Sequence, residues 1–257
     1  MSLASSLSTW QIPIWAEGRI AMERAALERD PVLRGEGVAR GDGQPVLLVP
    51  GFLAGDASLS PMARWLRDLG YRPARARMRV NVDCTTRAVK RLEEEVASLA
   101  ERHGRRVPIV GQSRGGVMAR LLAVRRPDLV EGIACLGSPL LEPLAVHPLV
   151  RAQIFAVGLL GSLGVPGLFS DACRSGDCCA LTRDQVQAPF PDGVRFVSVF
   201  SRWDGIVDWR TCLDPAAELV EVGGSHVGMA VNRQVFRALG AALAPATAPA
   251  AAAAAAA

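Results

Sequence analysis

The chain has 257 residues, of which 50% are hydrophobic and 21% charged, and its net charge is +4. This length and apolar content are enough for one large hydrophobic core, so a single domain with an insertion is expected. Nearly all the positive charge comes from arginines that are mixed with acidic residues, and aromatic residues are few. That pattern argues against a nucleic-acid partner.

The N-terminal stretch predicts one amphipathic helix, from about Ile14 to Glu28, that packs on the body of the protein. It has no basic region followed by an apolar run and a cleavage site, so we expect no secretory signal and a cytoplasmic location. The longest uncharged apolar run, Ile154 to Ser170, contains several glycines and a proline. It is shorter than the roughly 20 residues that a membrane-spanning helix needs. No transmembrane segment is therefore expected.

From Pro45 onward, strand-like and helical segments alternate. The strand-like segments are PVLLVP, RPARARMRV, VPIV and VEGIACLG, and the helical ones run from about Leu59 to Leu69, from Thr85 to His103 and onward from Ser113. Strands that alternate with helices of this length indicate crossover connections. The sequence therefore predicts an α/β fold, with a mostly parallel central sheet and helices on both faces.

The alternation stops after Ser138-Pro139 and resumes with VRFVSVF, ELVEV and a helix expected from about Val227 to Leu243. We interpret the interruption as an inserted cap rich in Gly, Leu and Cys. The final stretch, APATAPAAAAAAAA, is of low complexity and predicts a disordered tail. The expected division is an N-terminal extension (1–43), the first half of the core (44–138), the cap (139–193), the second half of the core (194–243) and the tail (244–257).

A serine stands between VPIV and the helix that follows it, in Gly111-Gln112-Ser113-Arg114-Gly115. G-x-S-x-G between a strand and a helix is typical of a nucleophilic serine, because only small residues fit on either side of such a sharp turn. A phosphate-binding loop is disfavoured, since no lysine follows the glycines and no G-x-G-x-x-G is present. Ser113 is therefore the candidate nucleophile, in preference to a purely structural turn.

A serine nucleophile needs a base and an acid that orients the base. Of the three histidines, His226 follows the last expected strand, whereas His103 ends a charged helix and His147 lies in the cap. Two aspartates follow the VRFVSVF strand, and Asp204, at an Asp-Gly turn, is preferred over Asp208 as the acid. The order along the chain is then Ser, Asp, His.

The oxyanion of the reaction needs hydrogen-bond donors. Backbone N–H groups are expected to provide them, one from Arg114, next to the serine, and one from Phe52. Gly51 in the VPGFLAG turn would let the N–H of Phe52 point into the site.

The segments PVLLVPGFLAG, IVGQSRGGVMAR, GSP, FVSVFSRWDGIVDW and GGSHVGMAVN, in this order, together resemble bacterial α/β-hydrolases of the esterase/lipase type. The resemblance runs from about Pro45 to Leu239, except in the cap. It implies a triad of Ser113, Asp204 and His226 and an oxyanion hole formed by Phe52 and Arg114.

Two positions depart from the pattern of that family. Pro50-Gly51 stands where His-Gly is common, and Arg114 stands where methionine or leucine is more usual. The backbone donors survive both changes. The arginine side chain would face solvent or meet a polar or acidic part of a substrate.

The cap is expected to select the substrate. Its apolar half would cover an acyl-binding groove, with Trp203 and Trp209 adding to the wall. The alternative, which stays open, is that these apolar residues are the core of a helical insertion.

The chain has six cysteines, and Cys135, in the apolar run IACLG, is expected to be an inert buried thiol. The cluster DACRSGDCC, which contains Cys173, Cys178 and Cys179, allows a disulfide that involves Cys212. Such a disulfide would favour an oxidising, extracytoplasmic compartment. Zinc is disfavoured, because the spacings match no common finger and no histidine is near in sequence. No metal and no cofactor are expected.

Together these features predict a serine hydrolase that cleaves carboxylic esters with a hydrophobic acyl part through an acyl-enzyme, acting on a small-molecule or lipid ester. An acyltransferase or a thioesterase would use the same triad. A catalytically silent member of the fold that binds a lipid or a protein partner is the alternative from another class. Dehalogenase chemistry is disfavoured, since it requires an aspartate in place of Ser113.

Overall fold

The structure is a computed structural model, and it describes residues 12–176 and 179–244. The expected tail lies outside the described residues except for its first residue, and Cys178 also lies outside them. No helix in the described ranges is both long enough and apolar enough to cross a membrane.

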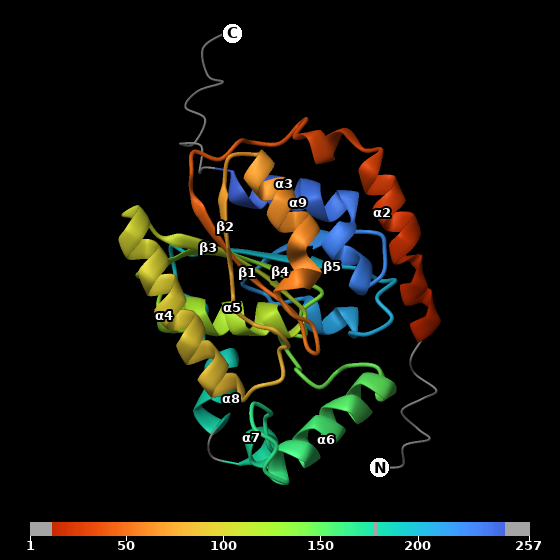
Figure 1. Cartoon of the computed structure of the whole chain (residues 1–257), viewed down its shortest axis with the longest axis vertical. Helices are drawn as coiled ribbons and strands as arrows, with labels where there is room; N and C mark the ends of the chain where they lie inside the picture. Colours follow the sequence, from red (N-terminus) through yellow and green to blue (C-terminus); the bar gives the residue numbers. More distant parts are fainter. Residues whose placement is uncertain (1–11, 177–178, 245–257) are drawn as a thin grey trace, which may run out of the picture.

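A six-stranded parallel sheet forms the centre of the protein (Figure 1). Its order is β2-β1-β3-β4-β5-β6, and each neighbouring pair is parallel. The strands are β1 (Pro45–Val49), β2 (Arg72–Arg75), β3 (Val107–Gln112), β4 (Val130–Leu136), β5 (Arg195–Phe200) and β6 (Glu218–Glu221). Every residue of β1 and β3 is buried, because helices cover both faces of the sheet. The predicted fold class is confirmed.

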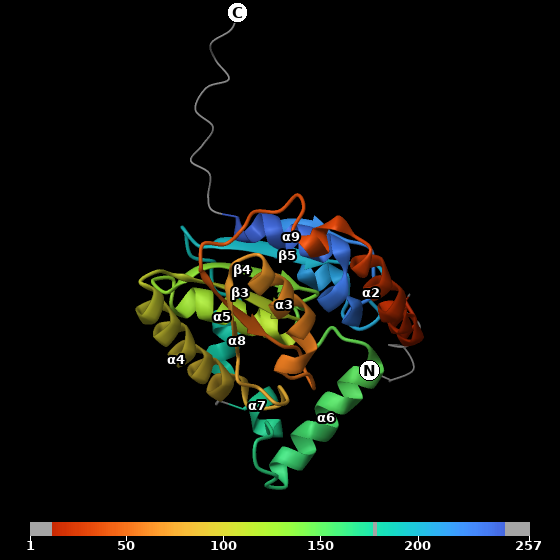
Figure 2. The ribbon, with the colours of Figure 1, turned by 45° about the horizontal axis from the view of Figure 1, so that its top comes forward.

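Two helical layers enclose this sheet (Figures 1 and 2). One face packs on α2 (Ile20–Glu28), α3 (Ser60–Asp68) and α9 (Arg233–Leu243), where the rings of Trp65 and Phe236 lie 4.7 Å apart. The other face packs on α4 (Thr85–His103) and α5 (Arg114–Arg125) through residues that include Val89 and Met118. The sheet therefore has a core on each side.

The segment between β4 and β5, residues 139–193, contains α6 (Pro148–Ser162), α7 (Asp171–Ser175) and α8 (Ala180–Val186). We call it the α6–α8 segment. Figures 1 and 2 show α6 and α7 on the side of the molecule away from α9. Short 3-10 helices occupy Ile14–Arg19 (η1), Pro31–Arg34 (η2), Asp56–Leu59 (η3), Trp209–Cys212 (η5) and Val227–Val231 (η6).

Three expected elements differ from the observed ones. The single N-terminal helix expected over Ile14 to Glu28 is divided into the 3-10 helix η1 and the α-helix α2. The single helix expected over Val227 to Leu243 is divided into η6 and α9, because the side chain of Asn232 accepts hydrogen bonds from the N–H groups of Gln234 and Val235 and starts a new helix. The extended segment expected over RPARARMRV is a strand only in β2. It ends before Arg77, whose φ of 56° is incompatible with a strand.

Candidate active site

Ser113 occupies a strained turn between β3 and α5. Its φ is 53° and its ψ is −122°, a backbone conformation that residues other than glycine rarely adopt. The turn is tight, since a Cβ atom at Gly111 would collide with the carbonyl oxygen of Gly115, and one at Gly115 would collide with that of Val49. Steric crowding thus explains both glycines of the motif, and the turn places Ser113 at the end of a central strand.

His226 and Asp204 form a buried pair on two neighbouring loops. Nδ1 of His226 lies 2.6 Å from Oδ2 of Asp204, and the residues are 5% and 4% exposed. The other carboxylate oxygen of Asp204 accepts hydrogen bonds from the N–H groups of Ile206 at 2.8 Å and Val207 at 2.7 Å. Both oxygens of Asp204 are therefore held, and one of them points at the imidazole.

Asp208, the alternative acid, has a different role. Its carboxylate accepts a hydrogen bond from the N–H of Arg210 at 3.1 Å and caps η5. It also lies 3.3 Å from the guanidinium of the same arginine. The geometry thus favours Asp204 as the partner of His226.

The charge state of His226 depends on opposing effects. Burial disfavours the imidazolium form, but the negative charge of Asp204, the hydrogen bond to it and the charge of Glu17 outweigh burial. The pKa of His226 is consequently raised above its ordinary value of 6.5.

Glu17, in η1, connects the loop that carries Asp204 to the loop that carries His226. The sequence analysis did not identify this residue. One of its carboxylate oxygens accepts hydrogen bonds from the N–H groups of Gly205 at 2.9 Å and His226 at 3.1 Å, and the other accepts from Val227 at 2.8 Å. The N-terminal extension thus supports the residues next to Asp204 and His226. No local pattern distinguishes Glu17 from the other glutamates of an amphipathic helix.

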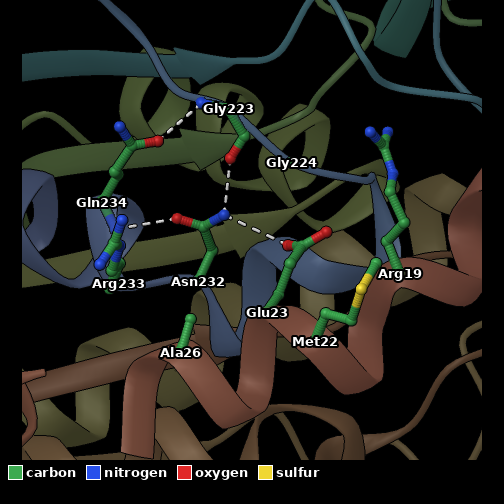
Figure 3. Close-up of a pocket in the computed structure, with 9 residues that line it drawn as sticks. All are labelled: Arg19, Met22, Glu23, Ala26, Gly223, Gly224, Asn232, Arg233 and Gln234. Carbon is green, nitrogen blue, oxygen red and sulfur yellow. Dashed lines mark hydrogen bonds between the residues drawn. The ribbon is translucent and has the colours of Figure 1, made fainter. Parts of the chain in front are cut away.

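Helix α2 holds the same loop through Glu23 (Figure 3). Its carboxylate accepts hydrogen bonds from the N–H and hydroxyl of Ser225, both at 2.8 Å, and from the amide of Asn232 at 3.2 Å. The same amide donates to the carbonyl oxygen of Gly223 at 2.6 Å. The loop that carries His226 is therefore fixed by side chains of the N-terminal segment.

Gly137, directly after β4, lies against the buried pair. Its φ is 54°, and a Cβ atom there would lie 3.0 Å from Nδ1 of His226 and 3.1 Å from Oδ2 of Asp204. Any side chain would press on the hydrogen bond between these two residues. The sequence alone did not assign this glycine a role.

Replacing Gly137 by alanine is expected to destabilise the protein. Gly104→Ala is the matched control, since Gly104 also has a positive φ, 63°, but has open space where its Cβ would be. The control should lower the free energy of unfolding by roughly 1–2 kcal/mol, and Gly137→Ala should lower it further because crowding adds to strain. Urea denaturation of both variants checks this. Equal effects of the two variants would contradict the role of crowding.

A cavity of about 890 Å³ opens beside Ser113. Ser113, His226, Phe52 and Arg114 all line it. Its size is within the range of small-molecule binding sites. The structure therefore brings the expected nucleophile, base and oxyanion-donor positions to one cavity, while the function of the N–H groups of Phe52 and Arg114 stays a prediction.

Helix α6 forms part of the cavity wall. Val150 and Ile154 line the cavity, whereas Phe155 and Leu159 are 47% and 56% exposed. One side of this helix thus faces the cavity, and another side presents large apolar side chains to solvent.

The two tryptophans expected in the wall lie elsewhere. Trp203 is 55% exposed and its ring packs beneath the guanidinium of Arg19, 5.6 Å from it. Trp209 stacks on Phe200, with the ring centroids 5.8 Å apart. Neither residue lines the cavity. The turns after β5 direct them away from it, and Phe169 is the aromatic residue that joins Phe52 in the wall.

The guanidinium of Arg114 holds the loop before α4. It donates hydrogen bonds to the carbonyl and side-chain oxygens of Asn81, both at 2.9 Å, to the carbonyl oxygen of Asp83, and to the hydroxyl of Thr85 at 3.1 Å. It also packs over the ring of Phe169, 5.6 Å from its centre. Burial lowers the pKa of Arg114 to about 10, so the side chain is still charged at neutral pH. The side chain therefore positions this loop, which the sequence analysis did not predict.

Comparison with known proteins identifies the fold. No protein-family model and no curated protein matches the sequence. Among solved structures, the mature lipase BlEst2 of Bacillus licheniformis is similar with a TM-score of 0.57 and 17% identity, over 80% of this chain and 94% of that one.

Two further solved structures are similar to a comparable degree. A soluble variant of monoglyceride lipase from Saccharomyces cerevisiae has a TM-score of 0.54 and 16% identity, over 81% of this chain and 86% of that one. A variant of tomato methylketone synthase I, complexed with β-ketoheptanoate, has a TM-score of 0.54 and 13% identity, over 78% of this chain and 97% of that one. The chain has the α/β-hydrolase fold. The expected resemblance to lipases and esterases is thereby confirmed for the fold.

Proposed function

We propose that this protein is a serine hydrolase that cleaves carboxylic esters with a hydrophobic acyl part. The observation that carries the proposal is the buried pair of His226 and Asp204, 2.6 Å apart, at the same cavity as Ser113 in its strained turn. A base held by an acid, beside a serine on a strand-to-helix turn, is the arrangement that activates a hydroxyl nucleophile.

The proposed reaction follows from the hydrogen bond that His226 already makes. Nδ1 of His226 is hydrogen-bonded to Asp204, so Nε2 is the nitrogen that takes the proton from Ser113. The serine oxygen attacks the ester carbonyl, and the N–H groups of Phe52 and Arg114 stabilise the oxyanion. The imidazolium returns the proton to the leaving alcohol, and water then hydrolyses the acyl-enzyme. This chemistry needs no cofactor.

The lining of the cavity supports a hydrophobic acyl group. Val117, Leu121, Val150, Ile154 and Phe169 all contribute to the wall. Apolar walls with a few placed polar groups are typical of sites for largely apolar ligands. In this proposal, the α6–α8 segment is a cap that selects the substrate.

A fluorophosphonate probe followed by an ester panel tests the proposal. The probe should label Ser113, and the purified protein should hydrolyse p-nitrophenyl esters with a preference that depends on acyl length. Failure of labelling would favour a catalytically silent protein that binds a lipid or a partner.

The ester panel, repeated with an added alcohol and with thioesters, separates hydrolysis of esters from the two alternative reactions. An acyltransferase would transfer the acyl group to an added alcohol in preference to water, and a thioesterase would prefer thioesters of the same acyl group. The fold does not choose among these reactions, because one fold hosts many chemistries.

The pH dependence of the proposed reaction follows from His226. The imidazole must be neutral to accept a proton, and its pKa is raised above 6.5. The value of kcat/KM should therefore fall as the pH is lowered through a pKa above 6.5, and a pH–rate profile with a p-nitrophenyl ester measures it. An acid limb at or below 6.5 would contradict this.

Replacing Glu17 by glutamine should shift that limb to lower pH and reduce kcat. Removal of the charge removes one influence that raises the pKa of His226. Glutamine also leaves a single oxygen to accept hydrogen bonds from three N–H groups, and displacement of catalytic groups can cost up to about 100-fold in rate.

Glu28→Gln is the matched control for this variant, since Glu28 is an exposed residue of α2 that pairs only with Arg24 among the described ion pairs. It should leave both the pH profile and kcat unchanged. A Glu17→Gln profile identical to that of the wild type would show that Glu17 has no influence on His226.

A further inference from the structure

Three cysteines from distant parts of the sequence meet beside the cavity. Cys84 immediately precedes α4, Cys173 lies in α7 and Cys179 immediately precedes α8. Their Sγ atoms all lie within 4.8 Å of one another, and those of Cys84 and Cys179 are 3.8 Å apart. Figures 1 and 2 show α7 and α8 beside the N-terminal end of α4. The α6–α8 segment and the core thus meet at a cluster of sulfur atoms.

The spacing of these atoms suits a metal ion. Thiolates bound at about 2.3 Å to a tetrahedral zinc ion lie about 3.8 Å from one another. A disulfide would require a sulfur separation of about 2.05 Å and would use two of the three thiols. We infer that Cys84, Cys173 and Cys179 bind one zinc ion, with a water molecule as the fourth ligand. Thiolate sulfur is a preferred ligand of zinc.

The surroundings suit the charge of such a site. Three thiolates and one Zn²⁺ carry a net charge of −1. The positively charged guanidinium of Arg114 packs on Phe169, which belongs to the same apolar cluster as Cys84 and Cys179. Cys84 is also at the N-terminus of the 19-residue helix α4, where the helix dipole favours negative charge.

Hydroxyl groups surround the sulfur atoms. Oγ1 of Thr86 lies 3.5 Å from Sγ of Cys179, and Oγ of Ser170 lies 3.7 Å from Sγ of Cys173. The hydroxyl of Thr86 is in turn 2.8 Å from that of Thr182 in α8. Hydrogen bonds to coordinating atoms orient metal ligands and stabilise their charge.

The other two described cysteines have different environments. Cys135 and Cys212 are fully buried, and burial raises the pKa of both thiols. Cys135 donates a hydrogen bond to the carbonyl oxygen of Gly116 at 3.4 Å. These two residues are therefore inert thiols, and Cys135 provides a control for the cluster.

The zinc ion would link α7 and α8 to the start of α4. Cys173 and Cys179 line the same cavity as Ser113, so this link would also hold one wall of the cavity in place. The linear spacing in DACRSGDCC gave no indication of the site, because the ligand Cys84 comes from another part of the chain. The inference does not depend on ester hydrolysis, since metal binding is measured without any substrate.

The test is the metal content of the full chain, purified under reducing conditions without chelator. Mass spectrometry of the metal should find stoichiometric zinc in the wild type. Cys84→Ser and Cys179→Ser should each lose it, whereas Cys135→Ser should retain it. Zinc retained in Cys84→Ser or Cys179→Ser, or no zinc in the wild type, would overturn the inference.

A second measurement needs no variant, in case the serine substitutions prevent folding. Replacement of the metal in the wild type by Co²⁺ should produce the intense near-ultraviolet charge-transfer band of cobalt–thiolate bonds. Absence of the band would overturn the inference. A disulfide between Cys84 and Cys179 in the same preparation, detected by peptide mapping without reduction, would also overturn the inference. It would show that a covalent bond, and not a metal ion, links these residues.

Discussion

Ester hydrolysis by the Ser113→Ala variant is expected to be at least about 10⁴-fold slower in kcat than that of the wild type, since loss of the nucleophile removes the acyl-enzyme route. The fold should be unchanged. Alanine carries the same Cβ as serine at the positive φ of residue 113, and the N–H of residue 113 can still donate its hydrogen bond, 2.8 Å long, to the carbonyl oxygen of Leu136. Steady-state kinetics with p-nitrophenyl esters and a thermal melt measure the two properties separately.

Ser98→Ala, in the exposed surface of α4, is the control for this experiment and should keep full activity. The Ser113 variant must also resist labelling by the fluorophosphonate probe. Activity or labelling retained in Ser113→Ala would show that another residue is the nucleophile, and the proposed function would be wrong in its central step.

Asp204→Asn should lower kcat by about 10³- to 10⁴-fold, which is the second-largest effect expected. The N–H groups of Ile206 and Val207 both donate to one oxygen of Asp204, so the amide oxygen of the asparagine should occupy that position. Its NH₂ group would then face Nδ1 of His226. A donor there leaves the proton of the neutral imidazole on Nε2, where it cannot accept a proton from Ser113.

Asp208→Asn is a matched control for the same chemical change four residues along the chain. Asp208 caps η5, and an asparagine can accept the same hydrogen bond, so its kcat should be close to that of the wild type. Kinetics of the two variants at one pH compare them directly. An equal loss of kcat in both variants, or a loss confined to Asp208→Asn, would show that the assignment of Asp204 as the acid is wrong.

Several elements were predictable because nearby residues decide them. The helix Thr85–His103 was predicted with the bounds that the structure has, since its apolar residues recur at helical spacing and Gly104 adopts the left-handed conformation that ends it. The strand–serine–helix turn was predictable for a similar reason, because its glycines relieve crowding within a few residues of Ser113. The parallel sheet followed from the alternation of strands and helices.

Other features depend on contacts between distant segments. Glu17 gives no signal in its own helix, yet three N–H groups of the loops after β5 and β6 converge on its carboxylate. Trp203 and Trp209 were expected in the wall of the cavity, but the direction of each ring depends on packing against Arg19 and Phe200.

The sequence by itself determined the order of the elements, the sheet class and the turn around Ser113, because local sterics and hydrophobic periodicity act over a few residues. Only the tertiary structure decided the hydrogen-bonded partner of His226 among two nearby aspartates, the function of Arg114 in holding the loop before α4, and the meeting of Cys84 with Cys173 and Cys179. These depend on the packing of the N-terminal segment and the α6–α8 segment against the core, which no local pattern specifies.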